Sequence, residues 1–117
     1  MGFKFEELIV WQKALDLTEE IHNLTLQFPA DEKYIITSQI KRAADSIALN
    51  IAEGSTGQSN AEFSKFLGYA IRSGIEVISC LHICKRRKLI NTAVFDELYE
   101  NTTVIVKMTQ ALKNKIK

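Results

Sequence analysis

The chain has 117 residues, of which 46% are hydrophobic and 25% are charged, and its formal net charge is +1 at pH 7. This length suits one domain, over residues 1–117, and this composition excludes a chain that is disordered throughout. The small net charge is unlike that of a dedicated nucleic-acid-binding domain, which is strongly basic. No apolar run approaches the roughly 20 residues of a membrane span, and the N-terminus lacks the features of a signal peptide. We therefore expect a cytoplasmic protein with no membrane contact.

Hydrophobic residues recur at alternating spacings of four and three along the chain, which predicts amphipathic helices that pack at a shallow angle. The predicted helices span residues 8–27, 31–53, 59–87 and 93 to near the C-terminus. Pro29 ends the first helix, because the residue before a proline avoids helical geometry, and Gly54 ends the second. The second helix has two candidate caps, Asp31 and, after an irregular stretch, Thr37.

The later boundaries carry clearer signals. Residues 54–58 (GSTGQ) form the plainest loop, and Ser59 with Glu62 has the spacing of a capping box. Asn91 or Thr92 caps the last helix. Because the loops are short, each helix packs antiparallel to the one before it. The sequence thus predicts an all-α, up-down-up-down four-helix bundle.

The third helix has an unbroken apolar spacing, whereas the fourth is the most polar of the four. The third keeps its spacing unbroken through Phe63, Leu67, Ala70, Gly74, Val77, Leu81 and Cys84. A glycine inside a helix costs about 1 kcal/mol relative to alanine, so we expect a close backbone contact at Gly74. The inner face of the fourth helix is predicted to comprise Leu98, Thr102, Ile105, either Met108 or Thr109, Leu112 and Ile116.

Three stretches stand out: residues 7–14 (ELIVWQKA), Phe28-Pro29 with Glu32, and residues 39–47 (QIKRAADSI) leading to 50–54 (NIAEG), with a weaker fourth over 63–76. Together they resemble the protein family encoded by intervening sequences of bacterial 23S ribosomal RNA genes, and the WQKA and NIAEG blocks are the specific ones. This resemblance implies a four-helix subunit assembled into a homopentameric ring, and it implies no known reaction. One departure is Arg72, which stands where many relatives have a glycine.

A related branch, the accessory proteins of diversity-generating retroelements, is also similar to this chain. Those relatives bind a reverse transcriptase and nucleic acid, and they are markedly more basic than this chain. The resemblance therefore makes RNA or a nucleic-acid enzyme the expected class of partner.

A polar stripe runs beside the apolar face of the second helix, at spacings of three and four residues. It comprises Gln39, Arg42, Ser46, Asn50 and Glu53. The turn near Gly57 brings Arg42 roughly level with Ser73 and Glu76 of the third helix, and we predict an ion pair between Arg42 and Glu76. The main interpretation is an inter-helix network that determines register; the alternative is a polar ligand pocket.

Two basic clusters are candidate contacts for nucleic acid. Lys85, Arg86, Arg87 and Lys88 end the third helix, and Lys113, Lys115 and Lys117 lie at the opposite pole. A run of cations at a helix C-terminus is also explained by the helix dipole, and acidic residues near positions 31 and 96 are expected to neutralise part of the first cluster. A repeated phosphate contact is the functional alternative.

Metal and redox sites have little support. Glu19 and His22 have the spacing of a di-iron motif, but no second copy exists, and His22 is expected to face outward. Cys80 and Cys84 lie one turn apart, and we assign them to the core rather than to zinc or a disulfide. No cofactor is expected.

Apolar side chains off the main seams indicate self-association, because one bundle needs only one apolar stripe per helix. The candidate interface residues are Trp11, Leu15, Phe66, Ile71, Ile75 and Ile78. The leading hypothesis is a non-enzymatic oligomeric scaffold, a pentamer, that binds RNA or a nucleic-acid enzyme. The alternatives are a purely structural or selfish-element protein with no ligand, and a metal-dependent bundle enzyme.

Overall fold

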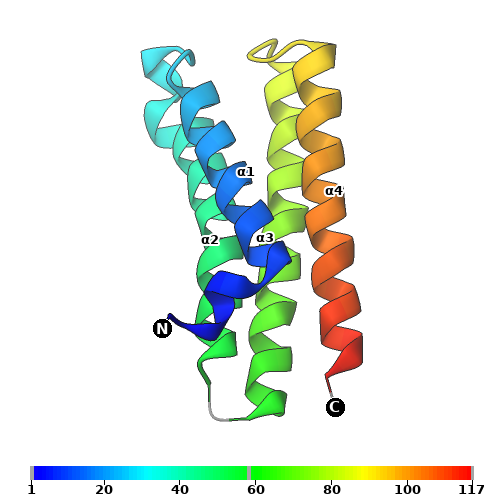
Figure 1. Ribbon diagram of the computed structural model, residues 1–117. Helices are drawn as coiled ribbons and strands as arrows, with labels where there is room; N and C mark the ends of the chain where they lie inside the picture. Colours follow the sequence, from blue (N-terminus) through cyan, green and yellow to red (C-terminus); the bar gives the residue numbers. More distant parts are fainter. Residues whose placement is uncertain (1, 58, 117) are drawn as a thin grey trace.

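The computed structural model describes residues 2–57 and 59–116 and contains four long helices. They are α1 (Ile9–Thr25), α2 (Ser38–Ser55), α3 (Asn60–Arg86) and α4 (Thr92–Lys115). The helices run alternately up and down in a body of 43 × 23 × 21 Å (Figure 1). The predicted four-helix fold is confirmed, and the described residues contain no strand. The ring of five subunits stays a prediction.

The core forms where the sequence places the apolar seams. All the predicted seam positions of α3 are buried, and α2 buries an apolar face made of Ile40, Ala43, Ile47 and Ile51. In α4, Thr109 rather than Met108 takes the inner position, and its hydroxyl donates to the Ile105 carbonyl at 2.7 Å. A buried threonine is therefore accommodated with its hydrogen bond made. Phe95 is also buried, one turn before the first seam residue that was predicted for α4.

The start of α2 follows the later of the two predicted alternatives. A short 3-10 turn (Ala30–Glu32) and a π-helical turn (Lys33–Thr37) precede it, and the α-helix begins at Ser38. Thr37 occupies the cap position without a side-chain capping bond. Its buried hydroxyl has no hydrogen-bond partner among the described residues.

The caps of α3 and α4 are the polar residues that precede them. Ser59 Oγ accepts a hydrogen bond from the Glu62 backbone N–H at 3.1 Å, which confirms this half of the capping box. Asn91 Oδ1 accepts from the Val94 backbone N–H at 2.8 Å, so Asn91 caps α4. Each cap satisfies one of the free N–H groups that every helix start exposes.

Two glycines let α3 approach both of its neighbours closely. The prediction that Gly54 ends α2 is wrong, because the helix continues to Ser55 and Gly54 is buried inside it. A Cβ atom on Gly54 would lie 2.6 Å from Cβ of Phe66, and one on Gly74 would lie 2.5 Å from Cγ2 of Val106. Gly54 is thus needed for α2–α3 contact, and the close contact predicted at Gly74 is confirmed against α4.

α3 is the one helix, among the described residues, that is long and apolar enough to cross a membrane by length and composition alone. The same composition is found in core helices of bundles. In this bundle α3 buries its seam against α2 and α4, and it carries Arg72 and Glu76 near its middle.

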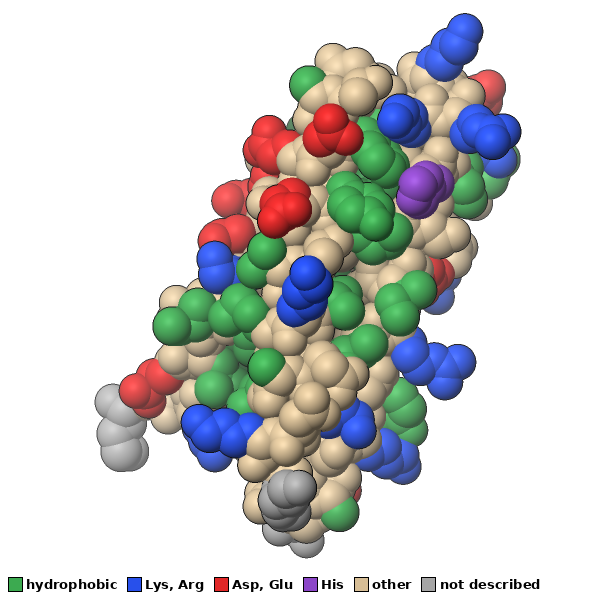
Figure 2. Space-filling view, turned by 90° about the vertical axis from the view of Figure 1, so that its right-hand side faces the viewer, with side chains coloured by type: hydrophobic (Ala, Val, Ile, Leu, Met, Phe, Trp, Pro, Cys, Tyr) green, Lys and Arg blue, Asp and Glu red, His purple; other side chains and the backbone are tan. Residues whose placement is uncertain are grey.

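Charge is unevenly distributed over the surface on the α4 side. Asp and Glu side chains gather along the upper part of one edge of this face, whereas Lys and Arg side chains lie at the top, over the middle and over the lower half (Figure 2). Hydrophobic side chains are visible between these groups. The small net charge of the chain therefore conceals local regions of opposite sign.

We expect Gly74→Ala to lower the free energy of unfolding by about 1–2 kcal/mol, because the added methyl group overlaps Val106 and overpacking outweighs the gain in helix propensity. Urea titration measures the change. Gly68→Ala is the matched control, since its Cβ atom would lie 3.6 Å from Lys113 Cε, an ordinary contact. That variant should be up to about 1 kcal/mol more stable than wild type. Equal effects of the two substitutions would contradict the close contact.

Candidate functional site

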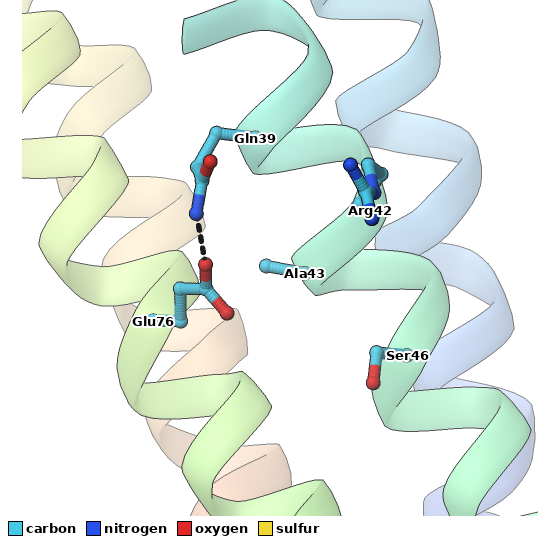
Figure 3. A pocket seen from close by; sticks show the side chains of 5 residues that line it. All are labelled: Gln39, Arg42, Ala43, Ser46 and Glu76. Atoms are coloured by element: carbon cyan, nitrogen blue, oxygen red, sulfur yellow. Dashed lines mark hydrogen bonds between the residues drawn. The ribbon is translucent and has the colours of Figure 1, made fainter.

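A polar pocket of about 380 Å³ lies between α2 and α3 (Figure 3). It is lined by Gln39, Arg42, Ala43, Ser46 and Glu76. Four of these residues come from consecutive turns of α2, because the polar stripe predicted there lies beside the apolar seam. The fifth comes from α3, which runs antiparallel alongside. The first three residues of the predicted stripe, Gln39, Arg42 and Ser46, thus line one wall of a pocket.

The predicted ion pair between Arg42 and Glu76 is wrong. Glu76 accepts a hydrogen bond from the side-chain amide of Gln39 instead, and Arg42 lies away from Glu76 (Figure 3). The prediction that this part of α2 stands opposite Ser73 and Glu76 of α3 is correct. Helix geometry, however, points Gln39 toward α3 and leaves Arg42 on the exposed side of α2. The guanidinium of Arg42 makes no ion pair within the described part of the chain.

The lower part of the stripe forms a chain of hydroxyl and amide groups across the two helices. Ser73 Oγ donates to Ser46 Oγ at 2.9 Å, and Asn50 Nδ2 donates to the same oxygen at 2.9 Å and to the Ser46 carbonyl at 2.8 Å. Glu53 ends the stripe and is exposed. These contacts fix register between α2 and α3, and they contain no nucleophile with an adjacent general base.

His22 is partly buried rather than simply facing outward. Its Nε2 atom lies 3.3 Å from Oδ1 of Asp45 on α2, a contact that was not predicted from the sequence. Glu19 lies next to this pair in a shallow groove between α1 and α2. The described residues contain no group of three or more His, Cys, Asp or Glu side chains placed to hold a metal ion.

An acidic groove between α1 and α4 was not predicted either. Burial raises the pKa of Glu20, and the neighbouring carboxylates of Glu97 and Asp16 raise it further. Asn101 Nδ2 donates to Glu20 at 3.4 Å, which opposes part of this shift. The groove is therefore an acidic surface on the side of the bundle away from α3.

Cys80 and Cys84 are free thiols in the core, as predicted from their spacing. Burial raises the pKa of Cys80 to about 11 and that of Cys84 to about 12. A thiol that stays protonated is a poor nucleophile and a poor metal ligand. Both cysteines are accordingly structural.

The basic run that ends α3 divides into two parts. Arg87 turns toward the 3-10 turn between α1 and α2 and pairs with Glu32 there at 3.1 Å, so part of the run is neutralised, as predicted. Lys85 extends over the ring of Phe95, with Nζ 4.5 Å from the ring centroid. Arg86 is exposed, and Lys88 has a left-handed φ of 61° where α3 turns into α4.

The second basic cluster lies at the other end of the bundle. Lys113 and Lys115 occupy the last turn of α4, and Lys117 lies outside the described residues. The Lys113 side chain packs beside Gly68 of α3. The two clusters are therefore separate surfaces, at opposite ends of α4.

The predicted interface residues differ in their exposure. Trp11, Phe66, Ile71 and Ile78 are partly buried within the subunit. Trp11 packs against the core and against the ring of Phe5 at 4.9 Å. Leu15 and Ile75 remain exposed, at 44% and 57%. Large exposed apolar residues that the prediction omitted include Leu49, in the middle of α2, at 66%.

We expect Ser46→Ala to lower the free energy of unfolding by about 1–2 kcal/mol, because the partly buried Ser73 and Asn50 lose a shared partner. Arg42→Ala, from the same stripe, should change it by less than about 0.5 kcal/mol, since Arg42 makes no ion pair. Urea titration of both variants tests the assignment. A larger loss for Arg42→Ala than for Ser46→Ala would restore Arg42 as the register residue.

Stability should fall in alkaline solution because of the two thiols. A cysteine in the unfolded chain has an ordinary pKa of about 9.0, whereas the folded thiols hold their protons to about 11 and about 12. Their contribution is thus fully present below pH 9 and is lost as pH rises toward about 11 for Cys80 and about 12 for Cys84, by up to about 1.4 kcal/mol per pH unit for each thiol. Urea titrations under reducing conditions should show a flatter alkaline decline in the Cys80→Ala, Cys84→Ala double variant. Parallel declines would contradict this.

Comparisons of the sequence and of the structure with known proteins identify the family of this chain. The sequence profile described as 23S rRNA-intervening sequence protein matches residues 6–111. No curated protein matches the chain. A crystal structure of a protein of unknown function, from the S23 ribosomal protein family of Bacteroides thetaiotaomicron VPI-5482, is similar with a TM-score of 0.85 at 26% sequence identity, covering 91% of this chain and 96% of that one. The chain therefore belongs to the 23S rRNA-intervening sequence protein family.

Proposed function

We propose that the protein is a non-enzymatic, cytoplasmic homo-oligomeric scaffold whose basic end contacts nucleic acid. The observation that carries the proposal is the set of apolar side chains left open on a subunit whose core is already complete. Leu49 and Ile75 lie in the middle of their helices, and they are 66% and 57% exposed. Large apolar side chains that a complete core leaves this exposed are candidates for an association surface.

The contact surface that we favour lies beside the groove between α1 and α2 and consists of Leu15 on α1 and Leu49 on α2, which are 44% and 66% exposed. We call it the Leu15–Leu49 face. His22 and Asp45 put the two antiparallel helices in register. Leu49 lies one turn along α2 from Asp45, and Leu15 lies two turns along α1 from His22, toward the same end of the bundle. A second copy that covers this face removes both leucines from water. If that copy covers the face with a different surface of its own, repetition of the contact produces a closed ring when the rotation closes, and a ring of five is what the family resemblance implies.

The nucleic-acid part of the proposal rests on the basic end of α3. Lys85, Arg86 and Lys88 make no ion pair with the described residues, whereas Arg87 is neutralised by Glu32. A few cations on one subunit bind phosphates weakly, and an oligomer that repeats them gains by multivalency. The non-enzymatic assignment is supported by the content of the α2–α3 pocket, which holds no paired nucleophile and base.

We expect Leu49→Glu to reduce the assembly to single subunits at micromolar concentration, as measured by light scattering. Binding of single-stranded RNA should weaken at least about tenfold with it, because multivalency is lost. Leu26→Glu is the matched control: Leu26 is 83% exposed but lies beyond the end of α1, so the assembly should persist.

Two results would contradict this proposal. A wild-type protein that is strictly monomeric at micromolar concentration contradicts the scaffold. RNA binding that is undetectable at low salt, or that does not weaken as salt rises, contradicts the nucleic-acid contact.

A further inference from the structure

Three aromatic side chains meet at the end of the bundle where α3 turns into α4. His82 of α3 lies 5.0 Å from Phe95 and 6.1 Å from Tyr99, measured between ring centroids, and the two α4 rings are 5.5 Å apart. Phe95 is buried and anchors the group, while His82 is exposed and Tyr99 is 40% exposed. We call these three residues the aromatic cluster. Its outer two rings are held in place by the inner one and remain open to solvent.

Unpaired cations border this cluster on the α3 side. Lys85 Nζ lies 4.5 Å from the Phe95 ring centroid, and Arg86 follows one turn after His82 on the same helix. Figure 2 shows a histidine beside hydrophobic side chains, with Lys and Arg side chains around the same end of the molecule. Partly exposed rings and flexible cations beside them are the two elements that nucleic-acid surfaces combine.

Acidic residues border the cluster on its other side. Asp96 and Glu100 follow Phe95 and Tyr99 directly on α4 and are exposed. A phosphate is therefore attracted to the α3 side and repelled from the outer side of α4. A base carries no charge and can occupy the space over Tyr99. This charge asymmetry favours one orientation for a nucleic-acid strand at the cluster, with the backbone along α3 and the bases toward α4.

We propose that the aromatic cluster, with Lys85 and Arg86, is a binding site for single-stranded nucleic acid. Bases stack on Tyr99 and His82, and backbone phosphates contact the two cations. A duplex keeps its bases stacked inside and offers no free face to these rings. The inference rests on the nucleic-acid part of the proposed function, and it adds a preference for single strands that charge alone does not supply.

Fluorescence anisotropy with the full chain tests this site, using a labelled 12-nucleotide RNA, the same sequence as DNA, and the RNA duplex. Tyr99→Ala should weaken single-strand binding roughly 5- to 100-fold and leave its salt dependence unchanged. Tyr99→Phe should bind as wild type does, because the ring is retained. Replacing both Lys85 and Arg86 with alanine should make binding less sensitive to salt. The plot of log affinity against log salt should become less steep by about 1.4, because two phosphate contacts are lost. Comparison of RNA with DNA decides which strand the site prefers.

The chain offers a closely matched control in Tyr69. This residue is 41% exposed, lies on α3, and has Lys65 Nζ 5.9 Å from its ring, but it is not part of the aromatic cluster. Tyr69→Ala should therefore bind single strands as wild type does. Circular dichroism establishes that each variant is folded, and His82→Ala provides a second test of stacking if Tyr99→Ala does not fold.

The outcomes separate this inference from the proposed function. If Tyr99→Ala binds normally while loss of Lys85 and Arg86 weakens binding, the stacking site is wrong and the nucleic-acid scaffold stands. Equal affinity for duplex and single strands also overturns the stacking site. A change in oligomer mass with Tyr99→Ala would reassign the cluster to a subunit contact. If the wild type binds none of the three probes, both proposals fail.

Discussion

The close approach of α3 to its two neighbours is the constraint on which the rest of the structure depends. Gly54 brings α2 against Phe66 of α3, and Gly74 brings α3 against Val106 of α4. A side chain at either glycine would push the helices apart, and every inter-helix contact along them would lengthen. Helix α3 therefore behaves as the central element, with the most extensive packing in the bundle on its α2 side and the next most extensive on its α4 side.

This packing places functional groups in register along both flanks of α3. On one flank, Ser73 meets Ser46 while Glu76 meets Gln39 one turn away. On the other flank, His82 reaches Phe95 and Tyr99 near the end of the bundle. The first flank is a polar seam that fixes register, and the second ends in exposed rings bordered by cations. The acidic groove between α1 and α4 lies away from both, so opposite charges occupy different surfaces of a nearly neutral chain.

Much of the fold could be predicted because it depends on local rules. The unbroken four-three spacing in α3 requires one buried face, and Ser59 and Asn91 cap their helices through bonds to residues three positions away. The site was less predictable. The sequence correctly placed Arg42 and Glu76 at the same height along the bundle, but the partner of Glu76 is Gln39. A rotation of α2 by a fraction of a turn decides which of its side chains faces α3. The misassigned end at Gly54 has a different cause, because a glycine can serve close packing as well as helix termination.

The sequence by itself determined the number of helices, their order and direction, their buried faces and the core placement of both cysteines, because periodicity and capping act within a few residues. Only the tertiary structure decided the partners across helices: His22 with Asp45, Arg87 with Glu32, and His82 with the rings of α4. Such pairs join residues far apart in the chain, and they depend on the rotation and separation of whole helices, which are set by the packing of the entire core rather than by any local pattern.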